Sequence, residues 1–268
     1  MKEEQLKLQT IAELVSLKGK TAVVTGGMTG IGWAVVRRLA QAGANIIIAD
    51  IRTEQAAEAV ESIRDEYGVQ VGIFRADVSD SDIMASLLKT VFEQSGRIDI
   101  LINNAGIYPL KDLMNVTDAD YDQVIDLNQR GTFVTSREAA KYMIIGERGG
   151  VIINIAGSAA VKTTGNSVHY IASKHAIIGL TKSFAKELGS SGIRVLAIAP
   201  SLINTPGIAK LREDSHVDEG MRQYARSLPL GRIGDPDDVA KVVLFAASGL
   251  SGYMTGSTIF VDGGEFSL

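Results

Sequence analysis

The chain has 268 residues and a formal net charge of −4, with 27 basic and 31 acidic residues mixed along its length. No basic run suggests a nucleic-acid partner, and no apolar stretch of about 18 residues suggests a membrane span. The sequence has no cysteine, and its three histidines are not spaced as metal ligands, which excludes disulfides, thiolate chemistry and a recognisable metal site. We therefore expect a cytoplasmic protein that binds neither nucleic acid nor membrane.

Short apolar runs alternate with segments of helical spacing from residue 20 to the end of the chain. The runs that predict strands are 21–25, 45–50, 71–77, 98–104, 150–156, 193–200 and 257–263. Most are apolar throughout, which is typical of strands covered by helices on both faces. Helical spacing at 31–42, 53–67 and 80–94 predicts crossover helices and a largely parallel sheet.

The helix signals are consistent with this alternation. Ser79 or Ser81 is expected to cap the helix that follows Asp77, and Asp235 with Pro236 is expected to begin a later one. No linker divides residues 19–268, which predicts a single domain. Residues 1–18 form an N-terminal extension. Its apolar residues could line one face of a short helix against the body or a neighbouring subunit, or the segment could fray in solvent; they are Leu6, Ile11, Leu14, Val15 and Leu17.

A glycine-rich turn, TGGMTGIG at 25–32, follows the first predicted strand. Glycines let the backbone turn tightly and approach a pyrophosphate, and the next helix offers free N–H donors at its N-terminus. A tight loop is the alternative, but the position between a strand and a helix favours a dinucleotide site. The candidate contacts are Gly26, Met28, Thr29, Gly30 and Ile31.

Asp50 ends the second predicted strand, where a carboxylate can accept hydrogen bonds from an adenosine ribose and repel a 2′-phosphate. The alternative is an N-cap for a helix that starts near Thr53. Arg52 complicates the prediction, because a basic side chain could accommodate that phosphate. We weight Asp50 more heavily, and NAD is favoured over NADP.

Tyr170 and Lys174 are spaced to share one helix face, one turn apart. An ammonium near a phenol favours the phenolate and is expected to bring its pKa down toward the working range of an acid-base catalyst. The spacing is common by chance, so it gains weight only from the motifs around it.

Together these residues resemble the short-chain dehydrogenase/reductase family over about residues 18–268. The matching residues are TGGMTGIG (25–32), Asp50, Asp77 with Val78, NNAG (103–106), Asn128, Tyr170 with Lys174, and a segment from Pro200 to Thr205. The resemblance implies a Rossmann-type, doubly wound α/β fold, a single domain whose seven-stranded parallel sheet has helices on both faces. It also implies a homo-oligomer, either a tetramer or a dimer.

The resemblance assigns expected roles to the catalytic candidates. Tyr170 would be the general acid/base, and Lys174 would lower its pKa and hold the nicotinamide ribose hydroxyls. Asn128 would anchor a water that links Lys174 to solvent; otherwise it is a polar helix residue.

The remaining matches would contact the cofactor. Asp77 and Val78 resemble the adenine contacts, and the turn of Asn104, Ala105 and Gly106 resembles the wall beside the cofactor. Thr205 resembles the hydroxyl that holds the nicotinamide carboxamide, with the backbone of Ile203 beside it.

The substrate-orienting serine of the family usually lies 13 residues before the tyrosine, and here that position is Gly157. Either the loop is one residue shorter and Ser158 points its hydroxyl at the substrate oxygen, which we favour, or Gly157 occupies the site and the enzyme is impaired. Serine at position 201, where the family often has glycine, is expected to be tolerated. His169 and His175 are expected to be packing or interface residues rather than a second acid.

The leading hypothesis is reversible hydride transfer between NAD and a small-molecule secondary alcohol, including a polyol or sugar, or its ketone. Residues 206–230 resemble a lid, and their mixed charges argue against a deep steroid-like pocket. One alternative is reduction of a 3-oxoacyl thioester, which Asp50 disfavours because that reaction usually draws on NADPH. Another is a nucleotide-binding regulatory protein without turnover, which the shifted serine motivates and the intact Tyr170 and Lys174 oppose.

Overall fold

Seven strands form one parallel sheet in the computed structural model, which describes residues 8–54 and 56–267. The strands are β1 (Thr21–Thr25), β2 (Asn45–Asp50), β3 (Val71–Arg75), β4 (Ile100–Asn103), β5 (Gly150–Ile155), β6 (Ile193–Pro200) and β7 (Thr258–Val261). Their order is β3-β2-β1-β4-β5-β6-β7, and every neighbouring pair is parallel. The seven-stranded parallel sheet predicted from the sequence is therefore confirmed.

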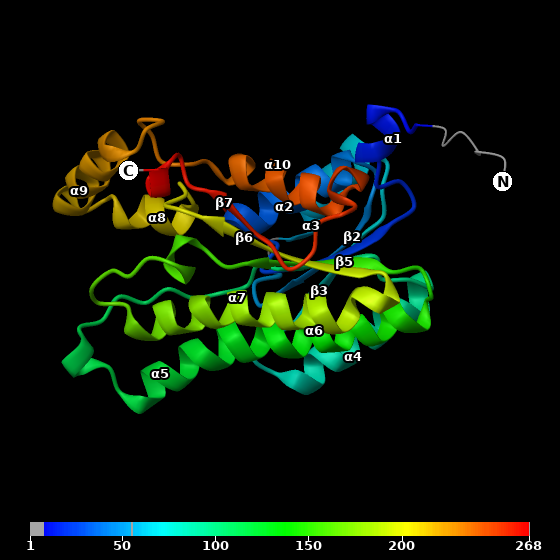
Figure 1. Cartoon of the computed structure of the whole chain (residues 1–268), viewed down its shortest axis with the longest axis horizontal. Coiled ribbons are helices and arrows are strands. Elements are labelled where there is room, and N and C mark those ends of the chain that lie inside the picture. The colour runs from blue at the N-terminus through cyan, green and yellow to red at the C-terminus, as the bar shows by residue number, and fades with distance from the viewer. Residues whose placement is uncertain (1–7, 55, 268) are drawn as a thin grey trace, which may run out of the picture.

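Helices connect the strands and cover the sheet (Figure 1). The α-helices are α1 (Ile11–Val15), α2 (Gly30–Gln41), α3 (Ala56–Tyr67), α4 (Ser81–Ser95), α5 (Asp118–Val124), α6 (Gly131–Ile145), α7 (Val168–Leu188), α8 (Pro206–Leu211), α9 (Ser215–Ser227) and α10 (Pro236–Ala247). Shorter helical segments are η1 (Leu113–Asn115), η2 (Ile125–Arg130), η3 (Ser158–Ala160), η4 (Gly189–Ser191), η5 (Gly249–Ser251) and η6 (Glu265–Ser267). Within the described ranges, none of these helices is both long and apolar enough to cross a bilayer.

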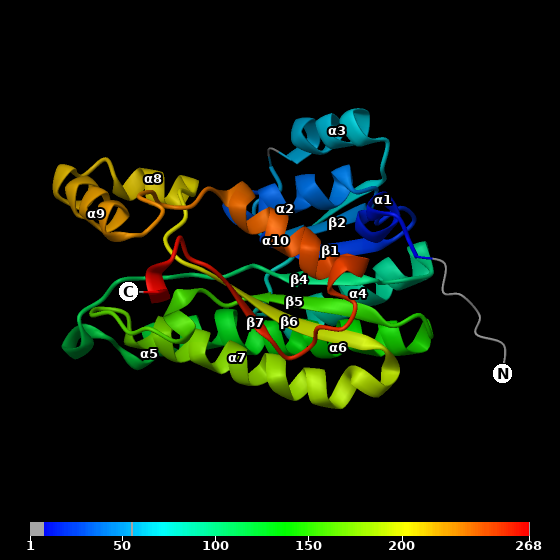
Figure 2. The same cartoon turned by 45° about the horizontal axis from the view of Figure 1, so that its top comes forward.

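The strands are apolar on both faces because both faces are covered. Successive side chains of a strand point to opposite faces, so Val24 of β1 packs toward α2 and α10 while Val23 packs toward α4 and α6. Figures 1 and 2 show these two helical layers, with α2, α3 and α10 on one side of the sheet and α4, α6 and α7 on the other. The result is the three-layer, doubly wound arrangement expected from the sequence.

The chain reverses its winding direction at β1, which pairs with both β2 and β4. In such a sheet the crevice between diverging connections lies outside the carboxyl ends of the strands, where ligands bind. The helices α8 and α9, which form the segment expected to be a lid, lie beyond this end of the sheet (Figure 2).

Two details at helix starts test the capping expectations. The prediction that Ser79 or Ser81 caps α4 is wrong, because Asp80 does so: its Oδ1 accepts from the backbone N–H of Asp82 and of Ile83, both at 3.0 Å. Ser79 instead donates its hydroxyl to Asp77 at 2.7 Å. The expected start of α10 at Asp235 and Pro236 is confirmed.

The N-terminal extension contains one short helix on the body. Thr10 and Glu13 cap α1 reciprocally, as in a capping box. Leu17, just after the helix, is buried in the core, and the Leu14 backbone lies against Gly249. Ile11 is 70% exposed, so the expected apolar face is buried only in part, and Leu6 lies outside the described residues.

Candidate active site

Two adjoining cavities lie at the carboxyl end of the sheet. One is a groove along the ends of β1, β2 and β4, whose lining includes Gly26, Asp50 and Asp77. The other, of about 440 Å³, lies between the ends of β5 and β6, α7 and the α8–α9 segment. Six residues line both cavities: Ile31, Tyr108, Ile155, Tyr170, Lys174 and Thr205. The groove is therefore continuous with a compartment large enough for a small organic molecule.

The glycine-rich turn brings the backbone of β1 and α2 into direct contact. Gly26 has a φ of +62°, a conformation that L side chains rarely adopt. A Cβ on Gly32 would lie 2.1 Å from the Gly26 carbonyl oxygen, so only glycine permits this close packing. The amide of Asn104 from the end of β4 donates to the carbonyl oxygens of Thr25 and Gly26, at 3.1 and 2.9 Å. This backbone cradle at the N-terminus of α2 fits the phosphates of a dinucleotide.

Asp50 lies at the end of β2 and is 3% exposed. Its carboxylate accepts from the Met28 N–H at 3.0 Å and from the Arg52 N–H at 3.0 Å. The alternative that it caps the next helix is not met, because α3 begins at Ala56. Asp50 thus holds the glycine-rich turn and faces the groove, while the Arg52 guanidinium reaches the Thr29 hydroxyl at 3.0 Å.

Most of the predicted cofactor contacts line the groove. They are Gly26, Thr29, Gly30, Ile31, Asp50, Asp77, Val78, Asn104, Ala105, Gly106, Tyr170, Lys174 and Thr205. Met28 does not line it: its side chain packs against the core, and its N–H is bonded to Asp50. Ile203 lines the second cavity instead, and the Thr205 hydroxyl accepts from the Ile208 N–H at 3.4 Å and caps α8.

Tyr170 and Lys174 lie where the two cavities meet. Both belong to the first turns of α7, and the Lys174 Nζ lies 5.7 Å from the centre of the Tyr170 ring. Lys174 is 6% exposed and donates to the carbonyl oxygen of Ile155 at the end of β5, at 2.9 Å. Tyr108 contacts Tyr170 edge-on from the other side, with ring centres 6.4 Å apart.

The pKa of Tyr170 does not follow the expected direction in this structure. Burial, followed by the neighbouring Tyr108, raises the pKa of Tyr170 to about 12. Burial also lowers the pKa of Lys174 to about 8. In this structure the Lys174 ammonium is bonded to Ile155 and loss of solvent dominates at the phenol, so the lowering of the Tyr170 pKa by Lys174 stays a prediction.

Asn128 belongs to η2, a π-helical segment between α5 and α6. It is 1% exposed, accepts from the Ile107 N–H at 2.9 Å, and donates to the Ile107 carbonyl at 2.9 Å and the Ser173 hydroxyl at 3.1 Å. A Cβ on Gly106 would touch both Asn128 and the Lys174 Nζ, at 3.3 and 3.7 Å. The structure thus brings Asn128 close to Lys174, as the family pattern implies. Single π turns are frequent at functional sites.

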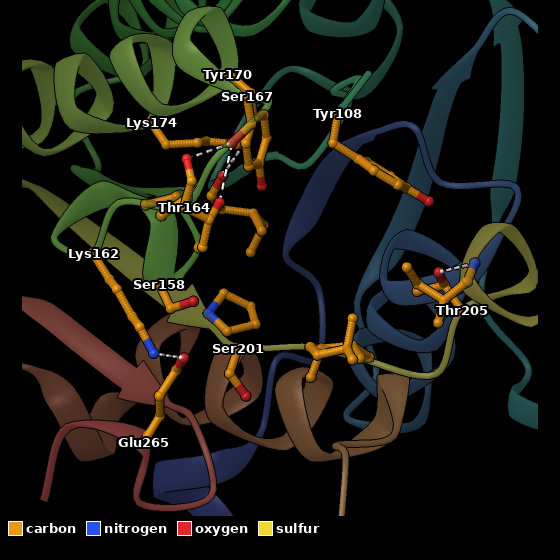
Figure 3. Close-up of a pocket in the computed structure, with 18 of the residues that line it drawn as sticks. Tyr108, Ser158, Lys162, Thr164, Ser167, Tyr170, Lys174, Ser201, Thr205 and Glu265 are labelled. Atoms are coloured by element: carbon orange, nitrogen blue, oxygen red, sulfur yellow. Dashed lines mark hydrogen bonds and ion pairs between the residues drawn. The ribbon is translucent and has the colours of Figure 1, made fainter. Parts of the chain in front are cut away.

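Gly157 and Ser158 lie shortly after the end of β5, in the wall of the cavity that Tyr170 also lines. Gly157 has a φ of +101°, and a Cβ there would lie 3.4 Å from the Tyr170 hydroxyl. Ser158 lines the second cavity, and its hydroxyl points into that cavity (Figure 3). A side chain at position 157 would be strained, whereas the next residue presents a hydroxyl to the compartment beside Tyr170.

The two histidines that flank the pair do not line either cavity. His169 is completely buried, and within the described part of the chain neither ring nitrogen has a hydrogen-bond partner. His175 is exposed, with its Nδ1 3.0 Å from the Ile171 carbonyl oxygen. Both placements are consistent with packing or surface roles.

The second cavity contains polar residues that the sequence patterns did not reveal. They are Tyr108, Lys162, Thr164, Ser167 and Glu265; Ser201, which the sequence did single out, and Tyr224 of α9 line the cavity as well. Burial, followed by the nearby charge of Glu265, raises the pKa of Tyr224 to about 12. Glu265 had a usable signal, because it follows Gly263 and Gly264 just after the last strand, and the carboxyl ends of parallel strands meet at one edge.

Comparison with known proteins identifies the family. Residues 26–265 match the family model described as enoyl-(acyl carrier protein) reductase. The chain is 39% identical over 249 residues to the 3-oxoacyl-(acyl-carrier-protein) reductase of Thermotoga maritima, covering 92% of this chain and 98% of that one. The chain belongs to the short-chain dehydrogenase/reductase family. It is an oxidoreductase that acts on CH–OH and keto groups with a nicotinamide dinucleotide, as the sequence predicts.

Two solved members of the short-chain dehydrogenase/reductase family show how the fold is shared across substrates and cofactors. The protein described as a 2-deoxy-D-gluconate 3-dehydrogenase from Agrobacterium tumefaciens, with NADP bound, has a TM-score of 0.86 and 33% identity, covering 95% of this chain and 99% of that one. Carveol dehydrogenase from Mycobacterium avium, in complex with NAD, has a TM-score of 0.86 and 31% identity, covering 94% and 99%. Relatives of similar likeness therefore differ in cofactor and substrate.

Replacing Lys174 by methionine tests the burial of its ammonium in this dehydrogenase/reductase. The folded-state pKa of about 8 lies below the ordinary value of 10.5, so the unfolded chain binds more protons between these pH values and wild-type stability rises with pH. We expect the difference in the free energy of unfolding between wild type and Lys174→Met to change in favour of wild type by roughly 2 kcal/mol from pH 8 to pH 10. Denaturant unfolding without cofactor measures it. The exposed Lys182→Met on the same helix should show a flat difference, and a flat difference for Lys174→Met would refute the assignment.

Proposed function

We propose that this protein interconverts a small secondary alcohol and its ketone, with NAD as its preferred cofactor. The observation that carries the proposal is the position of Tyr170 and Lys174 at the junction of the two cavities. One cavity has the backbone cradle and carboxylate suited to a dinucleotide, and the other has room for a small molecule. A group at their junction can act on an atom of the substrate next to the cofactor.

In this proposal Tyr170 handles the proton and Ser158 orients the substrate oxygen. In alcohol oxidation the phenolate of Tyr170 accepts the proton of the substrate O–H. In ketone reduction the phenol of Tyr170 donates a proton to the substrate oxygen. A bound nicotinamide would accept the hydride of the carbinol carbon in the oxidation and return it in the reduction. Ser158 donates a hydrogen bond to the substrate oxygen and stabilises the charge that develops there.

Lys174 and Asn128 support Tyr170. The Lys174 ammonium holds the ribose hydroxyls of the cofactor, and its positive charge favours the phenolate of Tyr170. Asn128 anchors a water beside Lys174 that connects the site to solvent. The short separation of Asn128 and Lys174 across Gly106 supports this role.

The preference for NAD rests on Asp50. Its buried carboxylate faces the groove and would repel a 2′-phosphate, whereas it can accept hydrogen bonds from a ribose diol. The exposed Arg52, whose Nε lies 3.5 Å from Asp50 Oδ1, offsets part of this negative charge and could pair with that phosphate, so the two side chains act in opposite directions. The carboxylate is the more constrained of the two, because the Met28 and Arg52 N–H groups hold it.

Reduction of a 3-oxoacyl thioester is the second candidate, because the Thermotoga maritima relative is named for that reaction. Asp50 counts against it if NADPH is the donor. The two candidates separate in one assay, in which acetoacetyl-coenzyme A with NADPH is compared with a panel of alcohols and NAD. A regulatory protein without turnover would bind NAD and be silent in every assay.

A cytoplasmic location and a homo-oligomer, either tetramer or dimer, also stay predictions. Exposed apolar side chains on α6, among them Phe133 and Ile144, support self-association.

We predict that Tyr170→Phe lowers turnover of any accepted alcohol by at least about 10²–10⁴-fold, because the ring stays but the proton-transfer group is lost. Cofactor affinity should change little. Absorbance of the reduced nicotinamide measures turnover, and cofactor fluorescence measures binding. Turnover retained by the variant would remove Tyr170 from its role.

Ser158→Ala is expected to lower kcat by about 10²–10³-fold, because it removes a donor to the developing charge. The neighbouring Ala159→Ser variant, measured in parallel, should leave kcat within a fewfold of wild type if position 158 alone holds the donor. An unchanged rate in Ser158→Ala would point to another donor.

Asp50→Asn is expected to lower the ratio of kcat/KM for NAD over NADP by about tenfold or more, because the repulsion of a 2′-phosphate is removed. Asparagine keeps an acceptor for the Met28 N–H. Arg52→Gln should move the ratio the opposite way. A wild type that prefers NADP would contradict the role of Asp50.

A further inference from the structure

The second cavity contains an ion pair whose carboxylate is buried and whose ammonium is about half exposed. Lys162, in the segment between β5 and α7, donates to the Oε1 of Glu265, just after β7, at 2.8 Å. The Glu265 side chain is 7% exposed, and both residues line the cavity. In Figure 3 they lie beside Ser158 and Ser201, at the end of the cavity away from Tyr170.

The second oxygen of this carboxylate is unsatisfied. Glu265 Oε2 is buried, and no described residue donates a hydrogen bond of normal length and angle to it, although the Tyr224 hydroxyl lies near enough for the carboxylate to raise its pKa. A buried acceptor without a partner is costly, and for a charged group the cost is larger. An unpaired oxygen on the wall of a ligand cavity is therefore placed to accept a hydrogen bond from the ligand.

We propose that Glu265 accepts a hydrogen bond from a second hydroxyl group of the substrate. The enzyme therefore prefers a neutral polyol, such as a sugar or a cyclic diol, over a simple secondary alcohol. The proposal rests on the proposed alcohol–ketone function. One hydroxyl is the reacting group at Tyr170, and the second donates to Glu265 Oε2.

The charges beside Glu265 select a neutral donor. Lys162 would repel a substrate ammonium bound to the same carboxylate, and Glu265 would repel a substrate carboxylate that approached Lys162. A hydroxyl can donate to Oε2 without either penalty. Other hydroxyl groups on the same cavity wall, those of Ser158 and Ser201, suit a ligand with several hydroxyls.

Glu265→Gln is the sharpest variant, because it changes the chemistry of one atom. Lys162 needs an acceptor, so the amide oxygen takes the Oε1 position and the amide NH₂ replaces the unpaired Oε2. The site then offers a donor where the substrate hydroxyl expects an acceptor. Lys162→Met keeps the carboxylate and removes only its cation, and the exposed Glu61→Gln on α3 is the surface control.

The test compares kcat/KM for cyclohexanol with that for the cyclohexane-1,2-, 1,3- and 1,4-diols and D-glucitol, at saturating NAD. We expect the best diol or polyol to exceed cyclohexanol by about 10²-fold or more in wild type, because a site built for a hydroxyl rejects the analogue that lacks it. Glu265→Gln should lower this ratio by about 10–10²-fold, while kcat/KM for cyclohexanol changes little. Lys162→Met and Glu61→Gln should keep the preference.

Three results would overturn the proposal. One is a wild type that turns over cyclohexanol as well as every diol and polyol, which leaves the alcohol–ketone function intact. Another is an equal loss of kcat/KM on all substrates in both Glu265→Gln and Lys162→Met, together with a lower Tm in both variants. The ion pair would then only stabilise the fold. The last result concerns binding. If no alcohol is turned over, the proposed function fails, but calorimetric titration with D-glucitol still tests the contact with Glu265. Binding about tenfold weaker in Glu265→Gln than in wild type supports the contact, whereas equal binding or none overturns it.

Discussion

Lys174 donates from a buried Nζ to the carbonyl oxygen of Ile155 and so joins the first turns of α7 to the end of β5. A buried ammonium is costly, and a single carbonyl compensates it only in part, which is why burial lowers its pKa. Tyr170 lies one helical turn earlier on α7, between the two cavities. The Lys174 ammonium is thus kept in an unfavourable, buried environment beside Tyr170, where its positive charge and its exchangeable proton can serve acid-base chemistry.

The other side of the site is built from backbone rather than side chains. The Gly26–Gly32 contact and the Asn104 amide bring β1, α2 and β4 together without side-chain bulk, and Asp50 holds the turn through the Met28 N–H. A groove formed in this way has a shape that varies little with surface sequence. Relatives bound to NAD and to NADP share this fold.

The substrate compartment, in contrast, is built from connecting segments. Its walls come from the segment after β5, the α8–α9 segment and the residues after β7, which are connections at the end of a rigid sheet. Connections can change without disturbing the core, and members of one family carry names as different as 3-oxoacyl-(acyl-carrier-protein) reductase, 2-deoxy-D-gluconate 3-dehydrogenase and carveol dehydrogenase. In this chain the Lys162–Glu265 pair places charge and an open acceptor in that compartment.

The sequence by itself determined the parallel sheet, its two helical layers and the cofactor groove, because strand hydrophobicity, glycine spacing and the Tyr170–Lys174 turn are local patterns. Local patterns also suggested Ser158, and the left-handed backbone of Gly157 gave the physical reason. Only the tertiary structure decided the pKa of Tyr170, which depends on burial, and that Asp80 rather than a serine caps α4. It alone brought Lys162 to Glu265 across 103 residues, since no local rule relates a loop after β5 to the end of the chain.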